Sequence, residues 1–169
     1  MAAPRQVPQR TPPQQKRSIP HTLFLTATWI LKGLLRLGIP MGPMILLTVR
    51  GRKSAKLRTT PVDLFRRGEH SYLVSTHRQE SSNWVKNLRE AGAGTLTRGW
   101  SRRAIKVVEL APEAAGRVLK EVLGPRLASP VGGVVLRRTF SIAPEAPLEE
   151  FIAAAQSHPV FEIVDQKAA

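Results

Sequence analysis

The chain has 169 residues, a length typical of one domain, and 42% of them are hydrophobic, which is enough to form one core. It contains no cysteine, which excludes disulfides, thiolate-bound metals and a cysteine nucleophile and is compatible with a reducing compartment. The formal net charge of +14 points to an anionic partner, and it is unevenly spread, because eleven Lys and Arg but no Asp or Glu precede Asp63.

The first twenty residues are rich in Pro, Gln, Lys and Arg and contain almost no bulky apolar groups. Such a segment cannot bury enough surface to offset the entropy lost on ordering, so we expect 1–20 to be a disordered basic tail. It is acid-poor, as transit peptides are, but its prolines disfavour the amphipathic helix that a transit peptide forms.

Residues 21–40 predict an amphipathic helix that ends at Pro40. Its uncharged run, 22–31, is too short for a membrane span, which needs about 20 apolar residues. Two interpretations remain open. The helix packs on its own domain, or it lies on an anionic membrane with Trp29 and its cations, Lys32 and Arg36, at headgroup level. The remainder, 41–169, is expected to form the folded domain.

From Met44 onward, short strand-like runs alternate with turns. The runs 44–50, 59–67 and 70–76 predict three antiparallel strands, and 95–100 with 102–110 predict a hairpin. Pro61 lacks a backbone N–H group, so it predicts a sheet edge or a bulge within the second strand.

Three further segments have helical patterns. The segment 81–91 predicts a short helix capped by Ser81 or Ser82, and 112–123 predicts a helix that begins at Pro112 and stops before Gly124. The segment 148–156 predicts a last helix. The segments 134–142 and 159–164 predict a strand or ordered segment and a short final strand. Together these elements favour an α+β fold or a small barrel.

Most catalytic and metal-binding patterns are missing. There is no Walker A loop, no GxGxxG after a strand, no HExxH and no nucleophile elbow, and the four histidines lack metal-ligand spacing. The main chemical clue is the stretch 49–60, with five cations and no anion between two predicted strands. Such a turn either binds a phosphate through backbone N–H groups and cations, or is a solvated basic hairpin.

The stretch 46–92 resembles the deazaflavin-dependent nitroreductase and quinone reductase family, which are split β-barrel proteins related to pyridoxamine-phosphate-oxidase-like flavin-binding domains. The likeness is close over about 40–112 and weaker to the end. It rests on the following residues: Leu46, Leu47, Thr48, Gly51, Arg52, Lys53, Ser54, Arg58, Thr60, Pro61, Arg78, Trp84, Asn87 and Leu88.

This resemblance implies a split barrel of about six antiparallel strands with short helices, and a reduced deazaflavin coenzyme, F-420, whose phosphate and oligoglutamate tail are anionic. Flavin mononucleotide is the less favoured cofactor. The phosphate and tail would be held by Arg52, Lys53, Ser54 and Arg58. The segment that passes along the coenzyme would be Thr59, Thr60, Pro61, Val62 and Asp63. The ring would face Ser75, Thr76, His77 and Arg78, and the pocket would be closed by Asn83, Trp84, Val85, Lys86 and Asn87.

Two of these residues also have a simpler interpretation. Trp84 shares a helix face with Leu88 and is expected to be a core residue, a pocket wall, or both. Asn87 either contacts the coenzyme or bridges backbone groups.

The implied reaction is hydride transfer from the reduced coenzyme to a small organic acceptor such as a quinone, an enone or a nitro compound. Nitroreductases of the family place several tyrosines near the substrate, whereas this chain has only Tyr72, and Ala55 stands where the family usually has glycine. No residue is assigned as catalytic, and no metal is expected.

The alternatives are a non-enzymatic carrier of an apolar ligand such as a fatty acid, and a nucleic-acid binder. The second is disfavoured because only 5% of residues are aromatic and no nucleic-acid motif is present. We expect a cytoplasmic protein, peripheral on the inner membrane face if 21–40 is interfacial. A homodimer is compatible with the fold but is not decided by the sequence.

Overall fold

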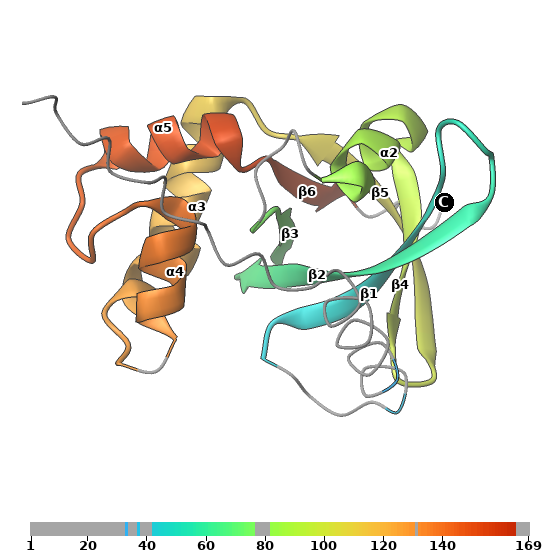
Figure 1. Cartoon of the computed structure of the whole chain (residues 1–169), viewed down its shortest axis with the longest axis horizontal. Coiled ribbons are helices and arrows are strands. Elements are labelled where there is room, and N and C mark those ends of the chain that lie inside the picture. The colour runs from blue at the N-terminus through green and yellow to red at the C-terminus, as the bar shows by residue number, and fades with distance from the viewer. Residues whose placement is uncertain (1–32, 34–36, 38–41, 77–81, 131, 165–169) are drawn as a thin grey trace, which may run out of the picture.

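The computed structural model describes residues 33, 37, 42–76, 82–130 and 132–164 of the chain (Figure 1). The predictions of a disordered tail over 1–20 and of a helix over 21–40 therefore lie outside the described residues, apart from Gly33 and Leu37. These two are joined by a hydrogen bond in which the Leu37 N–H donates to the Gly33 carbonyl at 3.0 Å.

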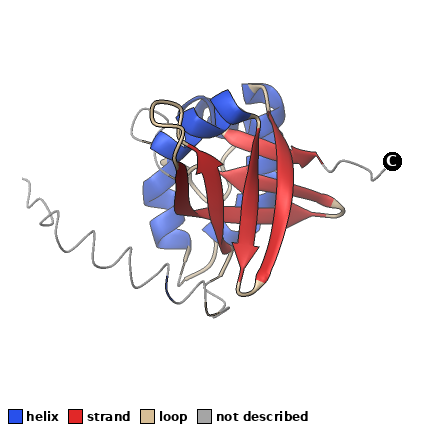
Figure 2. Cartoon of the chain, turned by 90° about the vertical axis from the view of Figure 1, so that its right-hand side faces the viewer, coloured by secondary structure: helices blue, strands red, loops and turns tan. Residues whose placement is uncertain are grey.

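The described chain forms a closed six-stranded antiparallel barrel, which confirms the predicted α+β split β-barrel (Figures 1 and 2). Around the barrel the strand order is β1-β2-β3-β6-β5-β4, and β4 pairs again with β1. The last strand along the chain is thus inserted between the first hairpins and the β4–β5 hairpin. The bounds are β1 Met44–Arg50, β2 Leu57–Arg67, β3 His70–Val74, β4 Ala93–Arg98, β5 Ser101–Glu109 and β6 Val160–Val164.

Four helices accompany the barrel in the described residues: α2 Asn83–Ala91, α3 Pro112–Leu127, α4 Gly133–Phe140 and α5 Leu148–Ser157. Helices α3, α4 and α5 form a layer beside β3 and β6, whereas α2 lies at the opposite end of the barrel, near the β1–β2 turn (Figure 1). The prediction of the short helix, with Ser82 at the N-cap position, is confirmed.

Alternation along the strands produces two cores. One core fills the barrel. Ile45, Leu47 and Val49 of β1 face inward and pack with apolar residues from each of the other five strands and with Val85 and Leu88 of α2. The other lies between the outer face of the barrel and the helix layer. It includes Phe65 of β2 and Tyr72 of β3, which are register partners and therefore point to the same face.

Two sequence-based expectations at the helix layer are wrong. The third helix does not stop before Gly124 but continues to Leu127, with Pro125 inside it. Leu123 and Leu127 are both fully buried against the neighbouring helices, and this burial outweighs the backbone hydrogen bond that Pro125 cannot donate.

The segment predicted as a strand over 134–142 instead contains α4. Val134 and Val135, whose branched side chains favoured a strand, are exposed. Leu136 and Phe140 are four residues apart and both pack on the outer core, which requires the helical period. The Arg137 guanidinium also donates to the Leu127 carbonyl and joins α4 to the end of α3.

Pro61 lies at a local sheet edge, one of the two predicted alternatives. All seven β2 residues from Leu57 to Asp63 have partners on β1, whereas pairing with β3 begins only at Asp63. The first half of β2 therefore has a strand neighbour on one side only within the described chain. This open stretch is where β2 and β3 diverge.

Candidate functional site

The basic turn, residues 51–56, is held by two backbone hydrogen bonds. The Gly51 N–H donates to the Lys56 carbonyl at 2.9 Å, and the Ala55 N–H donates to the Gly51 carbonyl at 2.8 Å. This path requires Ala55 to adopt φ of 55°, in the left-handed region that favours glycine. The closed turn holds its side chains outward, and Arg52, Lys53 and Ser54 are exposed.

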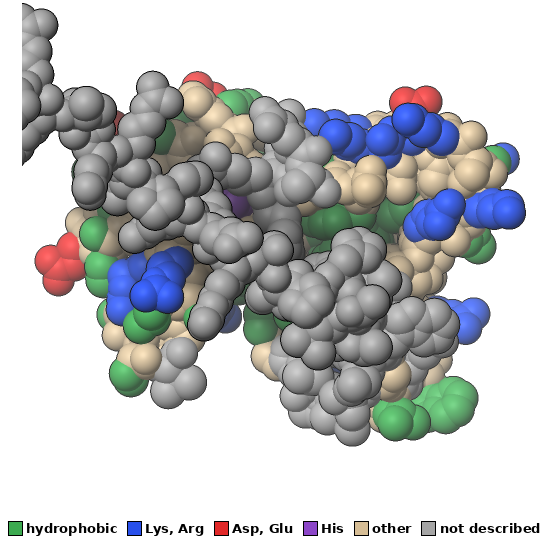
Figure 3. All heavy atoms as spheres, viewed as in Figure 1, with side chains coloured by type: hydrophobic (Ala, Val, Ile, Leu, Met, Phe, Trp, Pro, Cys, Tyr) green, Lys and Arg blue, Asp and Glu red, His purple; other side chains and the backbone are tan. Residues whose placement is uncertain are grey.

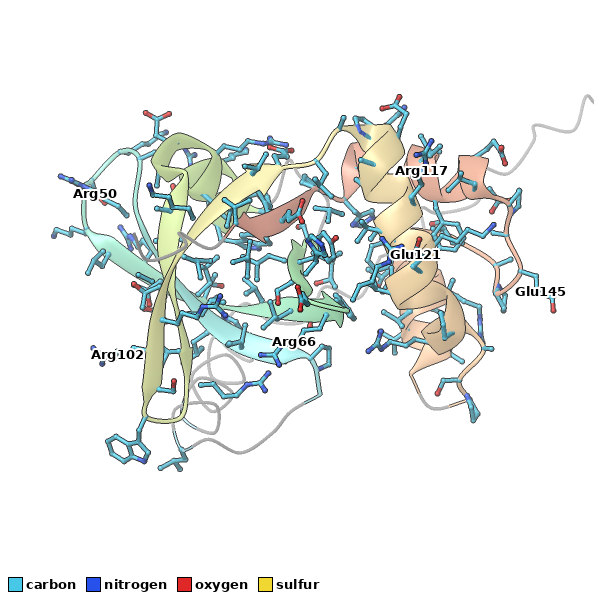
Figure 4. The ribbon with its side chains drawn as sticks, turned by 180° about the vertical axis from the view of Figure 1, so that it is seen from behind. Arg50, Arg66, Arg102, Arg117, Glu121 and Glu145 are labelled. Carbon is cyan, nitrogen blue, oxygen red and sulfur yellow. The ribbon has the colours of Figure 1, made fainter. Side chains whose placement is uncertain are left out.

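The cations of this turn have no carboxylate partner in the described part of the chain. The ion pairs found there join Arg67 to Glu121, His70 to Glu162 and Arg89 to Glu109. In Figure 4, Arg50 lies at the barrel end of the molecule, whereas Glu121 and Glu145 lie in the helix layer at the other end. The turn therefore presents uncompensated positive charge to solvent.

Asn87 of α2 joins the basic turn to the helix. Its side-chain oxygen, Oδ1, accepts from the Arg52 backbone N–H at 3.2 Å and from Arg52 Nη1 at 3.1 Å. Asn87 is only 7% exposed, so the amide is held within the protein while the guanidinium remains at the surface. Asn87 thus bridges backbone and side chain, one of the two interpretations of this residue, and it fixes the direction in which Arg52 leaves the turn.

The residues predicted to pass along the coenzyme lie on the open half of β2. Thr59 faces outward, where its hydroxyl is 2.8 Å from that of Thr48 on β1. Pro61 and Asp63 share this outer face by alternation. Thr60 and Val62 face the interior, and Val62 is buried in the barrel core, so only its backbone can reach a ligand.

The alternating direction of backbone groups along β2 shows which of them have no strand partner among the described residues. The Leu64 N–H donates to the Pro43 carbonyl on the β1 side, and alternate residues of a strand direct their backbone groups to the same side. The N–H and carbonyl of Thr59 and the carbonyl of Pro61 therefore point to the side where β3 is no longer paired. Because proline has no N–H, position 61 adds no unpaired donor to this edge.

The end of β3 is a rigid junction. The Ser75 N–H donates to the Pro159 carbonyl at 3.0 Å, and the Ser75 carbonyl accepts from Nδ1 of the buried His158 at 2.9 Å. The Ser75 hydroxyl also lies 3.3 Å from that of Ser82, the N-cap residue of α2. These contacts hold the residues on both sides of 76–81 together. Thr76 is half-buried, and the predicted ring contacts His77 and Arg78 lie outside the described residues.

Helix α2 closes the end of the barrel. Val85 is fully buried, and Trp84 is half-buried against the interior core, with its ring centroid 6.0 Å from that of Phe161. Trp84 is therefore a core residue with a partly accessible surface, which is compatible with both interpretations of it. Asn83 is exposed and Lys86 is half-buried.

Taken together, the structure brings the basic turn, the open half of β2, the end of β3 and α2 into one continuous region, because Arg52–Asn87 and Ser75–Ser82 join them. In Figure 3, Lys and Arg side chains gather over α2 and the basic turn at the barrel end, and hydrophobic side chains lie between them and the centre of the molecule. Among the described residues, no group of His, Asp and Glu is arranged for a metal ion, and no helix has the length and apolarity to cross a bilayer.

Sequence reasoning did not assign a role to His158 and did not predict the contact between the hydroxyls of Ser82 and Ser75. His158 is 83 positions from its partner Ser75, and no local spacing signals such a contact. Ser82 was expected to cap α2, but its side chain makes no capping bond and instead faces Ser75.

Comparisons with known proteins identify several similar proteins. The family model described as F-420H(2)-dependent quinone reductase matches residues 31–122, more than half of the chain. No curated protein matches this chain significantly.

Three solved structures are similar in fold. An F-420-H2 dependent reductase (FDR-A) is 17% identical, with 72% of this chain and 94% of that chain covered and a TM-score of 0.44. A putative 5-nitroimidazole antibiotic resistance protein from Bacteroides thetaiotaomicron is 10% identical, with 88% and 82% covered and a TM-score of 0.48. A Clostridium acetobutylicum protein of the pyridoxinephosphate oxidase family is 7% identical, with 86% and 85% covered and a TM-score of 0.46.

Proposed function

Because the chain belongs to the F-420H(2)-dependent quinone reductase family, an oxidoreductase family that uses the reduced deazaflavin coenzyme F-420, we propose that its basic turn binds the anionic end of that coenzyme. The observation that carries this proposal is the set of exposed cations on 51–58, which have no carboxylate partner among the described residues. One of them, Arg52, is held against α2 by Asn87. A bound polyanion would relieve the repulsion between them.

The phosphate and tail fit this donor set. Arg52, Lys53 and Arg58 supply charged donors, and Ser54 supplies a hydroxyl on the same turn. Charge-assisted hydrogen bonds of this kind contribute about 1.5–3 kcal/mol each when they are shielded from water, and less at an exposed turn. Arg58 lies in register with Val49 of β1, so its side chain leaves the strand at the mouth of the barrel.

The open half of β2 fits the middle of the coenzyme. The backbone groups of Thr59 and the carbonyl of Pro61 are available to a polar chain laid along the strand, in the manner of an added strand. These groups belong to the barrel wall and are already fixed in place, so the protein would lose little conformational entropy when it orients the coenzyme.

The ring would lie near the end of β3, between Thr76 and the accessible surface of Trp84. His158 and Ser82 hold the Ser75 junction in place and act as positioning residues. When bound, the reduced coenzyme supplies a hydride. The chain's own residues orient the reactants and exclude water, and no side chain is assigned as a proton donor.

We propose a quinone or enone as the acceptor, ahead of a nitro compound. The only tyrosine of the chain, Tyr72, is buried in the outer core against the helix layer, so it does not offer a hydroxyl to a substrate. The alternative function, a carrier of fatty acids, has no support in the described residues, since apolar side chains occupy the barrel interior.

Several assignments complete the proposal. Residues 1–20 are a basic tail, 21–40 an amphipathic helix on an anionic membrane surface, and 41–169 the catalytic domain of a cytoplasmic protein. A homodimer is compatible with this arrangement. Deleting 1–40 should weaken sedimentation with anionic vesicles, and sedimentation that persists unchanged would remove this segment from the membrane contact.

Titration of coenzyme F-420 fluorescence tests the site. The double substitution Lys53→Ala/Arg58→Ala should weaken binding at least about tenfold, because two charged donors are lost. The matched control, Arg117→Ala/Lys120→Ala, removes the same charge from the exposed face of α3 and should leave affinity nearly unchanged. No binding by the unmodified protein, or equal losses in both variants, would contradict the proposal.

A further inference from the structure

The tip of the β4–β5 hairpin exposes a large aromatic side chain. Trp100 is 95% exposed, more than any other large hydrophobic residue of the described chain. It lies in a two-residue turn, since Arg98 pairs with Ser101 and Gly99 has φ of 57°. Glycine at the first turn position is typical of a type II′ hairpin, whose twist matches the strands. The tryptophan is therefore held outward by a tight turn, not by a long flexible loop.

The strand register places this tip at the end of the barrel where the chain enters β1. Thr97 of β4 pairs with Leu46 of β1, so Trp100 lies beyond the first residue of β1, Met44. The basic turn follows the other end of β1, and Figure 4 shows the two ends of the barrel through Arg50 and Arg102.

The charge on the tip of the β4–β5 hairpin itself has one sign. Between Glu90 and Glu109 the sequence contains no acidic residue, and it contains four cations. Arg98, Arg102 and Arg103 flank the turn on both strands and are exposed. An exposed tryptophan among arginines is the composition of an aromatic belt at an anionic bilayer surface, where the indole enters the headgroup layer and the cations meet lipid phosphates.

We propose that this end of the barrel, the Trp100 end (Arg98, Trp100, Arg102 and Arg103), docks on an anionic phospholipid bilayer. Docking by this hairpin does not depend on the reductase function. It leaves the basic turn facing away from the lipid, so that a polyanionic coenzyme approaches from the aqueous side without repulsion from the bilayer. If the proposed quinone acceptor is correct, docking also brings the protein to the phase in which lipid-soluble quinones dissolve.

A bilayer fits this surface better than a nucleic acid or a second copy of the chain. Single-stranded nucleic acids require a series of aromatic platforms, whereas the tip presents one indole. A second copy would bring like charges, the three arginines of each copy, together around the symmetry axis of a dimer.

Vesicle binding of the full chain tests the proposal. With vesicles of phosphatidylcholine and phosphatidylglycerol, Arg102→Gln/Arg103→Gln should lower the partition coefficient by about thirtyfold and Trp100→Ser by about tenfold. Two controls match these changes in charge and hydrophobicity: Arg117→Gln/Lys120→Gln on α3 and Leu57→Ser at the opposite hairpin. Both should bind as the unmodified protein does. Vesicles of phosphatidylcholine alone should bind all variants weakly.

Local insertion can be measured separately, because the chain has no native cysteine. A polarity-sensitive fluorophore attached through Ser101→Cys should shift its emission to the blue on anionic vesicles, whereas the same fluorophore attached through Lys56→Cys should not. Equal shifts at both positions, or vesicle binding that is insensitive to Trp100→Ser, would overturn the proposal. So would dimerisation or duplex DNA binding that Trp100→Ser abolishes while vesicle binding persists.

The coenzyme titration separates this proposal from the proposed function. Trp100→Ser should bind F-420 with unchanged affinity in vesicle-free solution. Loss of vesicle binding with intact coenzyme binding supports docking, and absence of coenzyme binding with intact docking contradicts the reductase assignment alone.

Discussion

The bridge between Asn87 and Arg52 makes the sharpest prediction about the site. In Asn87→Ala, the Arg52 backbone N–H and guanidinium lose their shared acceptor, at 3.2 and 3.1 Å. A neutral hydrogen bond contributes about 1 kcal/mol and a charge-assisted one more, but the exposed guanidinium regains water, so we expect a total loss of about 1–2 kcal/mol. Urea denaturation followed by circular dichroism measures this loss as a lower midpoint at constant slope.

The companion variant, Asn87→Asp, separates structure from electrostatics. A carboxylate at this position still accepts both bonds, so stability should stay within about 0.5 kcal/mol of the unmodified protein. Its negative charge lies beside the proposed phosphate site, where a repulsion of about 1 kcal/mol lowers coenzyme affinity roughly fivefold. Asn87→Asp should thus be folded but weak in binding. If it binds F-420 as well as the unmodified protein while Asn87→Ala is equally stable, the bridge does not organise the site.

Three further predictions concern the fold. A methyl group added by Gly116→Ala would lie 2.6 Å from Cγ1 of Ile152, so we expect the free energy of unfolding to fall by about 1–3 kcal/mol. Gly124→Ala, in the same helix, has open space around the added methyl group and should raise the free energy of unfolding by about 0.5–1 kcal/mol. Chemical denaturation measures both changes. Ala55→Gly should stabilise the protein by about 0.5–1 kcal/mol because φ is 55° there, and a loss of stability would show that the turn is not left-handed. Burial, followed by the nearby charge of Glu162, raises the pKa of the Tyr72 hydroxyl above 10.0. Stability is therefore fully retained below the unfolded-state pKa and falls as the pH rises through the folded-state pKa, and Tyr72→Phe should flatten this alkaline decline in the free energy of unfolding.

Local patterns predicted most of the barrel, because strand alternation and turn residues operate over a few positions. The missing N–H group of Pro61 predicted a sheet edge or a bulge, and the structure shows the edge. The extent of α3 and the helical state of α4 could not be predicted, since Gly124 and Pro125 signal a stop and Val134 and Val135 favour a strand. Burial of Leu127 and Phe140 against other elements decides both cases, and only the packed structure shows it.

For the candidate site, too, the sequence predicted some features and only the structure shows the others. The exposed cations of the basic turn are visible in the sequence because they lack acidic neighbours. The bridge from Arg52 to Asn87 spans 35 positions, and the contact from His158 to Ser75 spans 83. Such contacts depend on how the barrel closes, so the sequence could nominate Asn87 without showing that it accepts from Arg52. Val62 and Val85 were nominated with their neighbours, and the structure places both side chains in the interior core.

The most direct measurement compares the affinity of this protein for coenzyme F-420 with its affinity for the neutral deazaflavin precursor that has the same ring but neither phosphate nor glutamate tail. We predict at least about tenfold tighter binding of the complete coenzyme at low salt, with the difference shrinking as ionic strength rises. Equal affinities for the two ligands at every salt concentration would contradict the claim that the basic turn exists to hold the anionic end of the coenzyme.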